Sequence, residues 1–167
     1  ALSIGTFMWR ASRPHMAVLG RLPGTEHFRN ERHFQVHTQP TLLLLRIDEN
    51  LFFANITGVL DRIQLELEGR PETRDLVLVL SSVSHVDLTA AEALQRLQAD
   101  LQSQGIELHL AEVKGPVLDR LQRSGWLQRL AHQPFLSVHI AVQALATSAP
   151  ATADRSRHPS AGTAGTH

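Results

Sequence analysis

Asp87 and Thr89, near the middle of the chain, are the side chains whose types and spacing are best suited to chemistry. A hydroxyl at the start of a helix can accept the backbone N–H three residues on, and Thr89 has Glu92 at that distance, as in a capping box. The same hydroxyl could instead accept a phosphate, since free N–H groups and the positive end of the helix dipole favour an anion there. Glu92 would repel that phosphate, so capping is the favoured interpretation. Asp87 is predicted to steady the loop through local N–H bonds or, as the less favoured alternative, to belong to a partner surface.

A second candidate is Lys114, which precedes Gly115 and Pro116 at the expected start of another helix. A lysine at this place could contact an anion or a nucleotide phosphate, although Pro116 removes one of the N–H donors that such a site uses. Neither a Walker-type phosphate loop nor the pattern Gly-x-Gly-x-x-Gly occurs in the chain. Lys114 is therefore kept only as a candidate anion or nucleotide contact.

Three histidines lie close together at His27, His33 and His37, with Glu26 and Glu31 among them. Their spacings of six and four residues match no strong metal-ligand motif, and the segment around them is polar. We therefore predict no metal site.

Composition argues against several classes of function. The chain has no cysteine, which excludes thiol catalysis and Cys-based metal sites, and it lacks the pattern Gly-x-Ser-x-Gly of hydrolases. Lys and Arg together number 16, as do Asp and Glu, so no net charge would attract nucleic acid. The sequence predicts a protein that is not an enzyme, uses no cofactor and has no nucleic-acid partner.

Apolar periodicity predicts the elements that must position these side chains. The uninterrupted apolar run 76–80 is typical of a strand covered on both faces, and 56–68 and 89–104 have helical spacing. Strands that alternate with helices predict an α/β fold with a largely parallel sheet. The predicted strands are 17–22, 41–47 (with Leu51–Ala54 as a continuation after a bend), 76–80 and 106–111, and the predicted helices are 56–68, 89–104, 117–124 and 141–145, with 136–140 either a last strand or the lead into the last helix.

Several single residues carry further expectations. Asn55 is predicted to cap the helix that follows it, and His109 to face solvent or a helix from its strand. Large apolar groups favour the core, so Trp126, Phe52 and Phe53 are assigned to it. The alternative for the phenylalanine pair is that one of them projects outward, because neighbours on a strand face opposite ways.

The chain divides into three predicted parts. Residues 146–167 are rich in Ala, Thr, Ser, Gly and Pro and hold no large apolar residue, so they are predicted to be a disordered tail. Residues 16–145 are the predicted folded domain. Residues 1–15 are predicted to be a linker or the end of a membrane helix, since the apolar stretch Ala1–Trp9 is too short to cross a bilayer by itself.

Several sequence blocks resemble one family. The blocks Ala17–Thr25 (AVLGRLPGT) and Leu51–Asn55 (LFFAN) are similar to the start of the C-terminal STAS domain of SulP-type, sulfate permease-like anion transporters. The strand 76–80 followed by Val86–Ala90 resembles the strand and switch loop that this domain shares with bacterial anti-sigma-factor antagonists. The resemblance covers about residues 12–145.

The switch loop carries the resemblance with two departures. The family pattern is Asp, two hydroxyl residues and Gly, and the second hydroxyl is the phosphoacceptor of the stand-alone antagonists, which maps onto Thr89. Here Leu88 replaces the first hydroxyl residue and Ala90 replaces the glycine. These departures weigh against phosphorylation.

The resemblance implies a STAS-type fold, that is, a mixed and largely parallel sheet with helices packed against it. It implies that this chain is a regulatory and assembly domain on the cytoplasmic face of the inner or plasma membrane. Its expected partners are the transmembrane transport unit of the same polypeptide, a second copy in a homodimeric parent and a cytoplasmic regulatory protein. Family substrates are sulfate, bicarbonate, chloride and dicarboxylates.

Two other functions stay open as alternatives. One is a free-standing phosphoswitch similar to an anti-sigma-factor antagonist, and the other, less favoured, is a nucleotide-binding module. The block Ala17–Thr25, with Ser12–His15 before it, resembles the junction between the last membrane helix and the STAS domain. It argues against the first alternative, because a free-standing module needs no membrane-to-domain linker.

Overall fold

The apolar runs of the sequence form the centre of one five-stranded sheet in the computed structural model, which describes residues 14–21, 28–30 and 39–148. The strands stand in the order β2-β1-β3-β4-β5. Their bounds are Met16–Arg21 for β1, Phe28–Asn30 for β2, Leu42–Ile47 for β3, Asp75–Val79 for β4 and Glu107–Ala111 for β5.

The sheet is mixed, as predicted. β3, β4 and β5 are parallel to one another, and each parallel pair is joined by a helix, as such connections require. β1 is antiparallel to both β3 and β2. The short strand β2 was missed, because its three residues lie in a segment whose polar composition indicated a loop.

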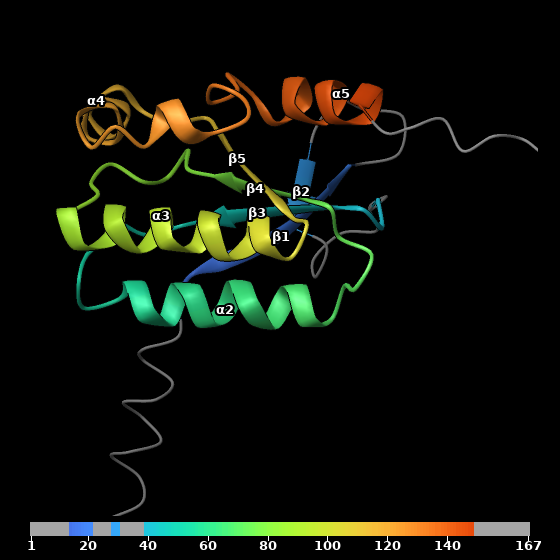
Figure 1. The fold of residues 1–167 in the computed structure, drawn as a ribbon, viewed down its shortest axis with the longest axis horizontal. Helices are drawn as coiled ribbons and strands as arrows, with labels where there is room; N and C mark the ends of the chain where they lie inside the picture. Colours follow the sequence, from blue (N-terminus) through green and yellow to red (C-terminus); the bar gives the residue numbers. More distant parts are fainter. Residues whose placement is uncertain (1–13, 22–27, 31–38, 149–167) are drawn as a thin grey trace, which may run out of the picture.

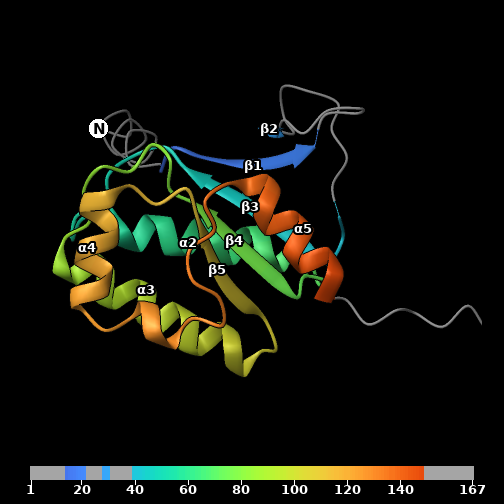
Figure 2. The same ribbon diagram turned by 90° about the horizontal axis from the view of Figure 1, so that it is seen from above.

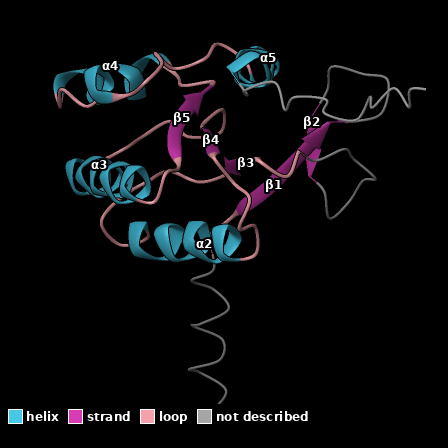
Figure 3. Ribbon diagram, turned by 45° about the vertical axis from the view of Figure 1, so that its right-hand side comes forward, coloured by secondary structure: helices cyan, strands magenta, loops and turns pink. Residues whose placement is uncertain are grey.

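Helices cover both faces of the sheet (Figure 1). α2 (Ile56–Glu68) and α3 (Leu88–Ser103) lie side by side on one face, and α5 (Val138–Ser148) lies on the other (Figure 3). α4 (Gly115–Arg123) and the short 3-10 helix η1 (Leu127–Arg129) follow β5, and Figure 2 shows α4 beside α3. The predicted helices agree with these bounds to within a few residues. The alternative of a last strand at 136–140 is wrong, since residues 136 and 137 lead into α5 and 138–140 belong to it.

The core has two layers because strand side chains alternate between the two faces. On β3, Leu43 and Leu45 are buried against the α2 and α3 side, whereas Leu44 is buried on the α5 side. On β4, Leu78 and Val79 divide in the same way. An uninterrupted apolar run is therefore what a strand covered on both faces needs, as the sequence indicated.

Trp126 anchors the first layer. It is completely buried, and its indole Nε1 donates to Gln98 Oε1 of α3 at 2.6 Å. The Nε2 group of Gln98 donates in turn to the backbone oxygen of Arg129 at 2.8 Å. The two hydrogen bonds join α3 to the segment after α4, and they satisfy polar groups that would be costly to bury alone. The assignment of Trp126 to the core is confirmed.

Two expectations about the strands were wrong. Leu51–Ala54 does not continue β3: only Leu51 pairs, as an isolated parallel bridge to Val86, and the chain then turns into α2. His109 does not face solvent, so that alternative is wrong. It is buried under the segment that leads into α5, with its Nε2 atom 2.9 Å from Asp75 Oδ1 and its ring 6.0 Å from that of Phe135.

The predicted outer parts of the chain lie almost wholly outside the described residues. The linker 1–15 is described only at residues 14 and 15, and the tail 146–167 only at 146–148, which belong to α5. The three histidines His27, His33 and His37 also lie outside the described residues.

Candidate functional site

The loops that follow the three parallel strands β3, β4 and β5 meet at the carboxyl ends of these strands. Ligands of open α/β sheets commonly bind outside the carboxyl ends of the strands, so a functional site is expected first in these loops. We call residues 50–53, 84–89 and Lys114 the strand-end surface. Asp87, Thr89 and Lys114, the three candidate residues from the sequence, all belong to it.

Asp87 holds the strand-end surface together. It is the N-cap of α3, with an extended backbone (φ −82, ψ 173), and its Oδ1 accepts the N–H of Ala90 at 2.8 Å. Its Oδ2 accepts the N–H of Phe53, 34 residues away in the chain, at 2.9 Å. One carboxylate thus starts a helix and ties that helix to the preceding loop. The prediction that Asp87 steadies the loop through N–H bonds is confirmed.

The predicted capping box is wrong. Because Asp87 takes the N-cap position, α3 begins at Leu88, and Thr89 is the second residue inside the helix. Thr89 and Glu92 are both exposed there. Asp and Thr are both favoured at the N-cap position. Asp87 takes that position because its backbone is extended and each of its carboxylate oxygens accepts a backbone N–H.

Asn50 is the residue that sequence reasoning missed. Its Oδ1 accepts the N–H of Ser84 at 2.8 Å and that of His85 at 3.0 Å. The backbones of the two loops are also joined directly, since Leu51 N donates to His85 O and Asp87 N donates to Leu51 O, each at 3.0 Å. The loops after β3 and β4 therefore form one hydrogen-bonded unit. An Asn in a turn is a common local acceptor, and that was the only signal in the sequence.

Asn55 occupies the N-cap position of α2, as predicted, but its side chain acts on the two joined loops. Its side chain makes no cap hydrogen bond. Instead its Oδ1 accepts the N–H of Phe52 at 3.0 Å, and its Nδ2 donates to the backbone oxygen of Asn50 at 2.7 Å. The position of the cap is thus confirmed, whereas its side chain holds the turn that carries the two phenylalanines.

Large apolar side chains project from this frame. Phe52 is 39% exposed, Phe53 71% and Leu88 57%. The assignment of both phenylalanines to the core is therefore wrong, and the alternative that one of them projects outward accounts for only one of the two. The reason is that Phe52 lies outside any strand and residues 53–55 form a turn, so no sheet face covers the two phenylalanines.

Lys114 reaches the same surface from the loop after β5. Its Nζ donates to Ser84 Oγ at 3.0 Å, and its backbone forms the N-cap of α4 without a side-chain cap bond. Gly115 and Pro116 open that helix, as predicted. A role of Lys114 toward an anion stays a prediction.

The hydrogen bonds and charges of the strand-end surface favour ionised Asp87. The N–H of Ala90, above all, and that of Phe53 hold the pKa of Asp87 below its ordinary value of 3.8, against an opposing effect of desolvation. The positive charges of His85 and Arg120 act in the same direction as the two N–H groups. The frame therefore keeps its central carboxylate charged at neutral pH.

A pH-dependent stability follows from this lowered pKa. A group whose folded pKa is depressed stabilises the fold above its unfolded pKa, and that stabilisation is lost as pH falls through the folded pKa. We expect Asp87→Asn to unfold at lower urea concentration than wild type at neutral pH, and the gap to be smaller at about pH 3, because protonation of Asp87 begins to remove the stabilisation below the ordinary Asp value of 3.8. Circular dichroism at both pH values checks this. A gap of equal size at both would contradict it.

Within residues 14–21, 28–30 and 39–148, no three His, Asp or Glu side chains are grouped so that they could hold a metal ion. In the same part of the chain, no helix has the length and apolar character needed to cross a membrane. The strand-end surface itself combines loops fixed by hydrogen bonds, the carboxylate of Asp87 and exposed apolar groups. Those features suit a contact with another macromolecule.

Comparison with known proteins assigns this arrangement to a family. Residues 33–141 match the protein-family profile described as STAS domain. The chain is 32% identical over 153 residues to "Probable sulfate transporter 4.2" of Arabidopsis thaliana, and the match covers 84% of this chain but 23% of that protein. The chain thus spans about a quarter of the length of the curated relatives it matches.

Solved structures share the fold. The murine Slc26a9 anion transporter in its inward-facing state matches with a TM-score of 0.75 at 19% identity, over 87% of this chain and 24% of that one. The SulP transporter STAS domain from Vibrio cholerae matches with a TM-score of 0.56 at 18% identity, over 70% of this chain and 90% of that one. The chain belongs to the STAS domain family.

Proposed function

We propose that this chain is the regulatory and assembly domain of a secondary anion transporter, placed on the cytoplasmic face of the membrane, and that it acts by docking through its strand-end surface. The transported anion would be of the sulfate, bicarbonate, chloride or dicarboxylate class. The observation that carries the proposal is the exposure of Phe52, Phe53 and Leu88 on a loop frame that is fixed by hydrogen bonds.

Exposed aromatic groups on a fixed frame suit protein recognition. Phe side chains bury a large area when a partner covers them, and a few such anchors commonly supply most of the binding energy. A surface that is already ordered loses little conformational entropy on binding. Asp87 and Asn50 supply that order here, since they join the two loops by side-chain hydrogen bonds.

The preferred partner is the transport unit of the same polypeptide. The similarity to proteins named as sulfate transporters supports this, because the chain matches only about a quarter of their length. A second copy of the parent and a cytoplasmic regulatory protein are further partners for the same surface. A ligand or modification at this surface would alter transport only through a difference in affinity for the transporter's states.

Deletion of residues 16–148 from the full-length parent tests the proposal. In a control variant, a flexible linker of equal net charge replaces the domain. This variant shows which effects arise only because the end of the transport unit is left without any following chain. We expect a loss in membrane insertion, in dimerisation or in anion flux. If all three measurements equal those of the intact protein, the proposal fails.

The phosphoswitch is a second candidate, favoured by the exposure of Thr89 in the first turn of α3. Two features oppose it: Asp87 already occupies the N–H of Ala90 that a phosphate would meet, and Glu92 lies one turn on. A mass increase of one phosphate on Thr89 in protein isolated from cells would support it.

A further inference from the structure

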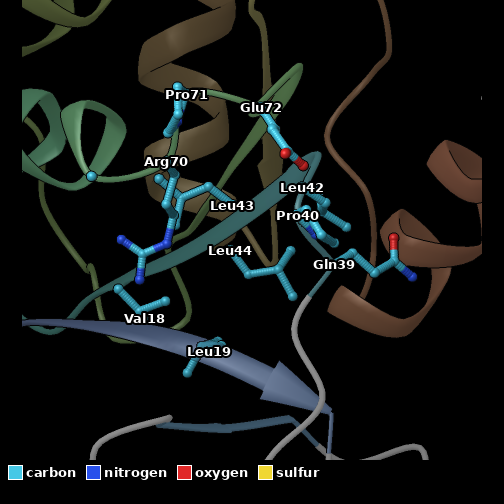
Figure 4. Close-up of a pocket in the computed structure, with 11 residues that line it drawn as sticks. Val18, Leu19, Gln39, Pro40, Leu42, Leu43, Leu44, Arg70, Pro71 and Glu72 are labelled. Carbon is cyan, nitrogen blue, oxygen red and sulfur yellow. The ribbon is translucent and has the colours of Figure 1, made fainter.

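A cavity of about 360 Å³ lies between β1, the start of β3 and the turn that follows α2 (Figure 4). It forms because β1 stops pairing with β3 after Val18 and pairs with β2 instead. Arg70 and Glu72 both line it, and Arg70 also bonds the backbone oxygen and the carboxylate of Glu66. The opposite charges leave the cavity without a preference for anions or cations.

His109 is a buried titratable group that lies outside the strand-end surface. It is 1% exposed, and its register partner Val77 belongs to the apolar layer under α5. Its Nε2 atom is 2.9 Å from Asp75 Oδ1, whereas its Nδ1 atom is buried without a hydrogen-bond partner among the described residues. Because an ionised carboxylate can only accept, the single ring proton of neutral His109 lies on Nε2, and Nδ1 keeps an unused lone pair.

Residues 131–137, which we call the lead segment, cover this histidine. The ring centroid of His132 lies 5.3 Å from that of His109, and the ring centroid of Phe135 lies 6.0 Å from it. α5 begins at Val138, directly after the lead segment. A change at His109 can therefore reach the start of α5 through its neighbours in the chain.

An isolated bridge attaches the lead segment to β5. Phe135 N donates to Leu110 O at 2.8 Å, and Glu112 N donates to Phe135 O at 2.9 Å. Glu112 has a φ of 55°, a left-handed conformation that residues with a side chain rarely adopt. The attachment thus combines two hydrogen bonds with a strained residue, and a short bridge of this kind is easier to open than a continuous strand pair.

Protonation of His109 acts on this attachment through Nδ1. A protonated imidazole carries an N–H at both nitrogens, and a buried N–H without an acceptor is costly. No described residue accepts from Nδ1 while the lead segment is in place, whereas water can accept once the segment moves away. The bond to Asp75 joins two strands of the sheet and is present in both arrangements, so it favours neither.

The other groups around His109 leave this direction unchanged. Glu107 lies two residues earlier on the same face of β5 and, like Asp75, stays with the sheet. His132 belongs to the lead segment, and its positive charge would repel a protonated His109 and so favour opening. Phe135 opposes opening only weakly, because 6.0 Å is the outer limit at which a ring attracts a cation. α5 contributes apolar side chains to this layer.

We propose that the attachment of the lead segment to β5 depends on pH: protonation of His109 releases the segment from β5 and loosens the start of α5 from the sheet. The neutral histidine is compatible with the closed arrangement, and the protonated one requires water at Nδ1. This property belongs to the domain alone and does not depend on docking through the strand-end surface.

Hydrogen exchange of the 167-residue chain, followed by NMR, tests the proposal. The probes are the amides of Phe135 and Glu112, and the readout is their protection relative to the intrinsic exchange rate at the same pH. One proton taken up on opening can raise the opening constant by at most about tenfold per pH unit. We expect protection of both amides to fall at least about threefold between about pH 7.5 and about pH 5.5, where histidine ordinarily changes charge. The amides of β4 are the internal reference and should keep their protection.

Three variants assign the effect to one side chain. His109→Gln can still donate to Asp75 but takes up no proton, so the pH dependence at the two amides should disappear. His132→Gln should keep the pH dependence, and its loss in that variant would overturn the role given to His109. His15→Gln removes an exposed histidine before β1 and should behave as wild type.

Nitrogen NMR of the His109 ring gives a second readout that needs no variant. At neutral pH we expect a proton on Nε2 and none on Nδ1. As pH falls, protonation of Nδ1 and loss of protection at Phe135 and Glu112 should follow the same curve. Constant protection while the ring takes up a proton, a ring that stays neutral down to about pH 5.5, or an unchanged pH dependence in His109→Gln would each overturn the proposal.

Discussion

Replacing Trp126 with alanine is expected to lower the free energy of unfolding by about 3–5 kcal/mol. Trp126 is completely buried among α3, α4 and the sheet, and its removal leaves a cavity that the surrounding helices cannot close. Domains are stable by about 5–15 kcal/mol in total, so this variant would be marginal. Urea unfolding followed by circular dichroism measures the loss, and a change below about 1 kcal/mol would contradict the assignment of Trp126 as an anchor.

The hydrogen bond of Trp126 can be separated from its volume. Trp126→Phe keeps most of the apolar area but leaves Gln98 Oε1 without the donor it has at 2.6 Å, and an unsatisfied buried group costs about 1–3 kcal/mol. Gln98→Leu removes the other partner. If the bond matters as described, the double variant is less destabilised than the sum of the two single variants. An additive result would assign the whole effect of Trp126 to packing.

Removing both phenylalanines of the strand-end surface is expected to abolish docking without loss of stability. Phe52→Ser and Phe53→Ser together remove the two aromatic anchors, and hot-spot residues contribute about 2 kcal/mol or more each, so affinity should fall by about a thousandfold. The measurement is binding of this chain to the transport unit of its parent, supplied as a separate polypeptide in detergent. Both side chains are exposed in the free domain, so the midpoint of unfolding should stay within the range of surface substitutions.

Leu65 provides the matched control for this experiment. It is 63% exposed on α2 and lies outside the strand-end surface, so Leu65→Ser removes apolar area of the same kind at another place. We expect normal docking by this variant. Docking that survives the double Phe substitution, or that is lost equally on Leu65→Ser, would count against the strand-end surface as the contact.

Much of the fold follows from local patterns along the chain. β3 and β4 were predicted because a run such as Leu76–Leu80 has no polar residue to turn toward water, and a strand covered on both faces needs none. α2 was predicted with the bounds Ile56–Glu68 because its four buried residues recur at helical spacing. The apolar run and the helical spacing both depend on residues that are close together in the chain, so they can be recognised from the sequence alone.

The composition of the strand-end surface was predicted less well. Asp87 was recognised, yet the cap was assigned to Thr89, since both residue types can cap a helix. The decision came from the N–H of Phe53, which lies 34 residues away and binds the second carboxylate oxygen of Asp87. Asn50 was missed for the same reason, because its two partners lie in the loop after the next strand.

The sequence by itself determined which residues form the apolar layers, where most helices begin and end, and which family the chain resembles. Only the tertiary structure decided which polar side chains meet, that His109 is buried while Phe52 and Phe53 are exposed, and that β1 diverges from β3 to leave a cavity. The physical reason is the range of the interactions. Periodicity and helix propensity act over a few residues. Hydrogen bonds between loops, and the burial of His109 by the later segment that contains Phe135, depend on residues that only folding brings together.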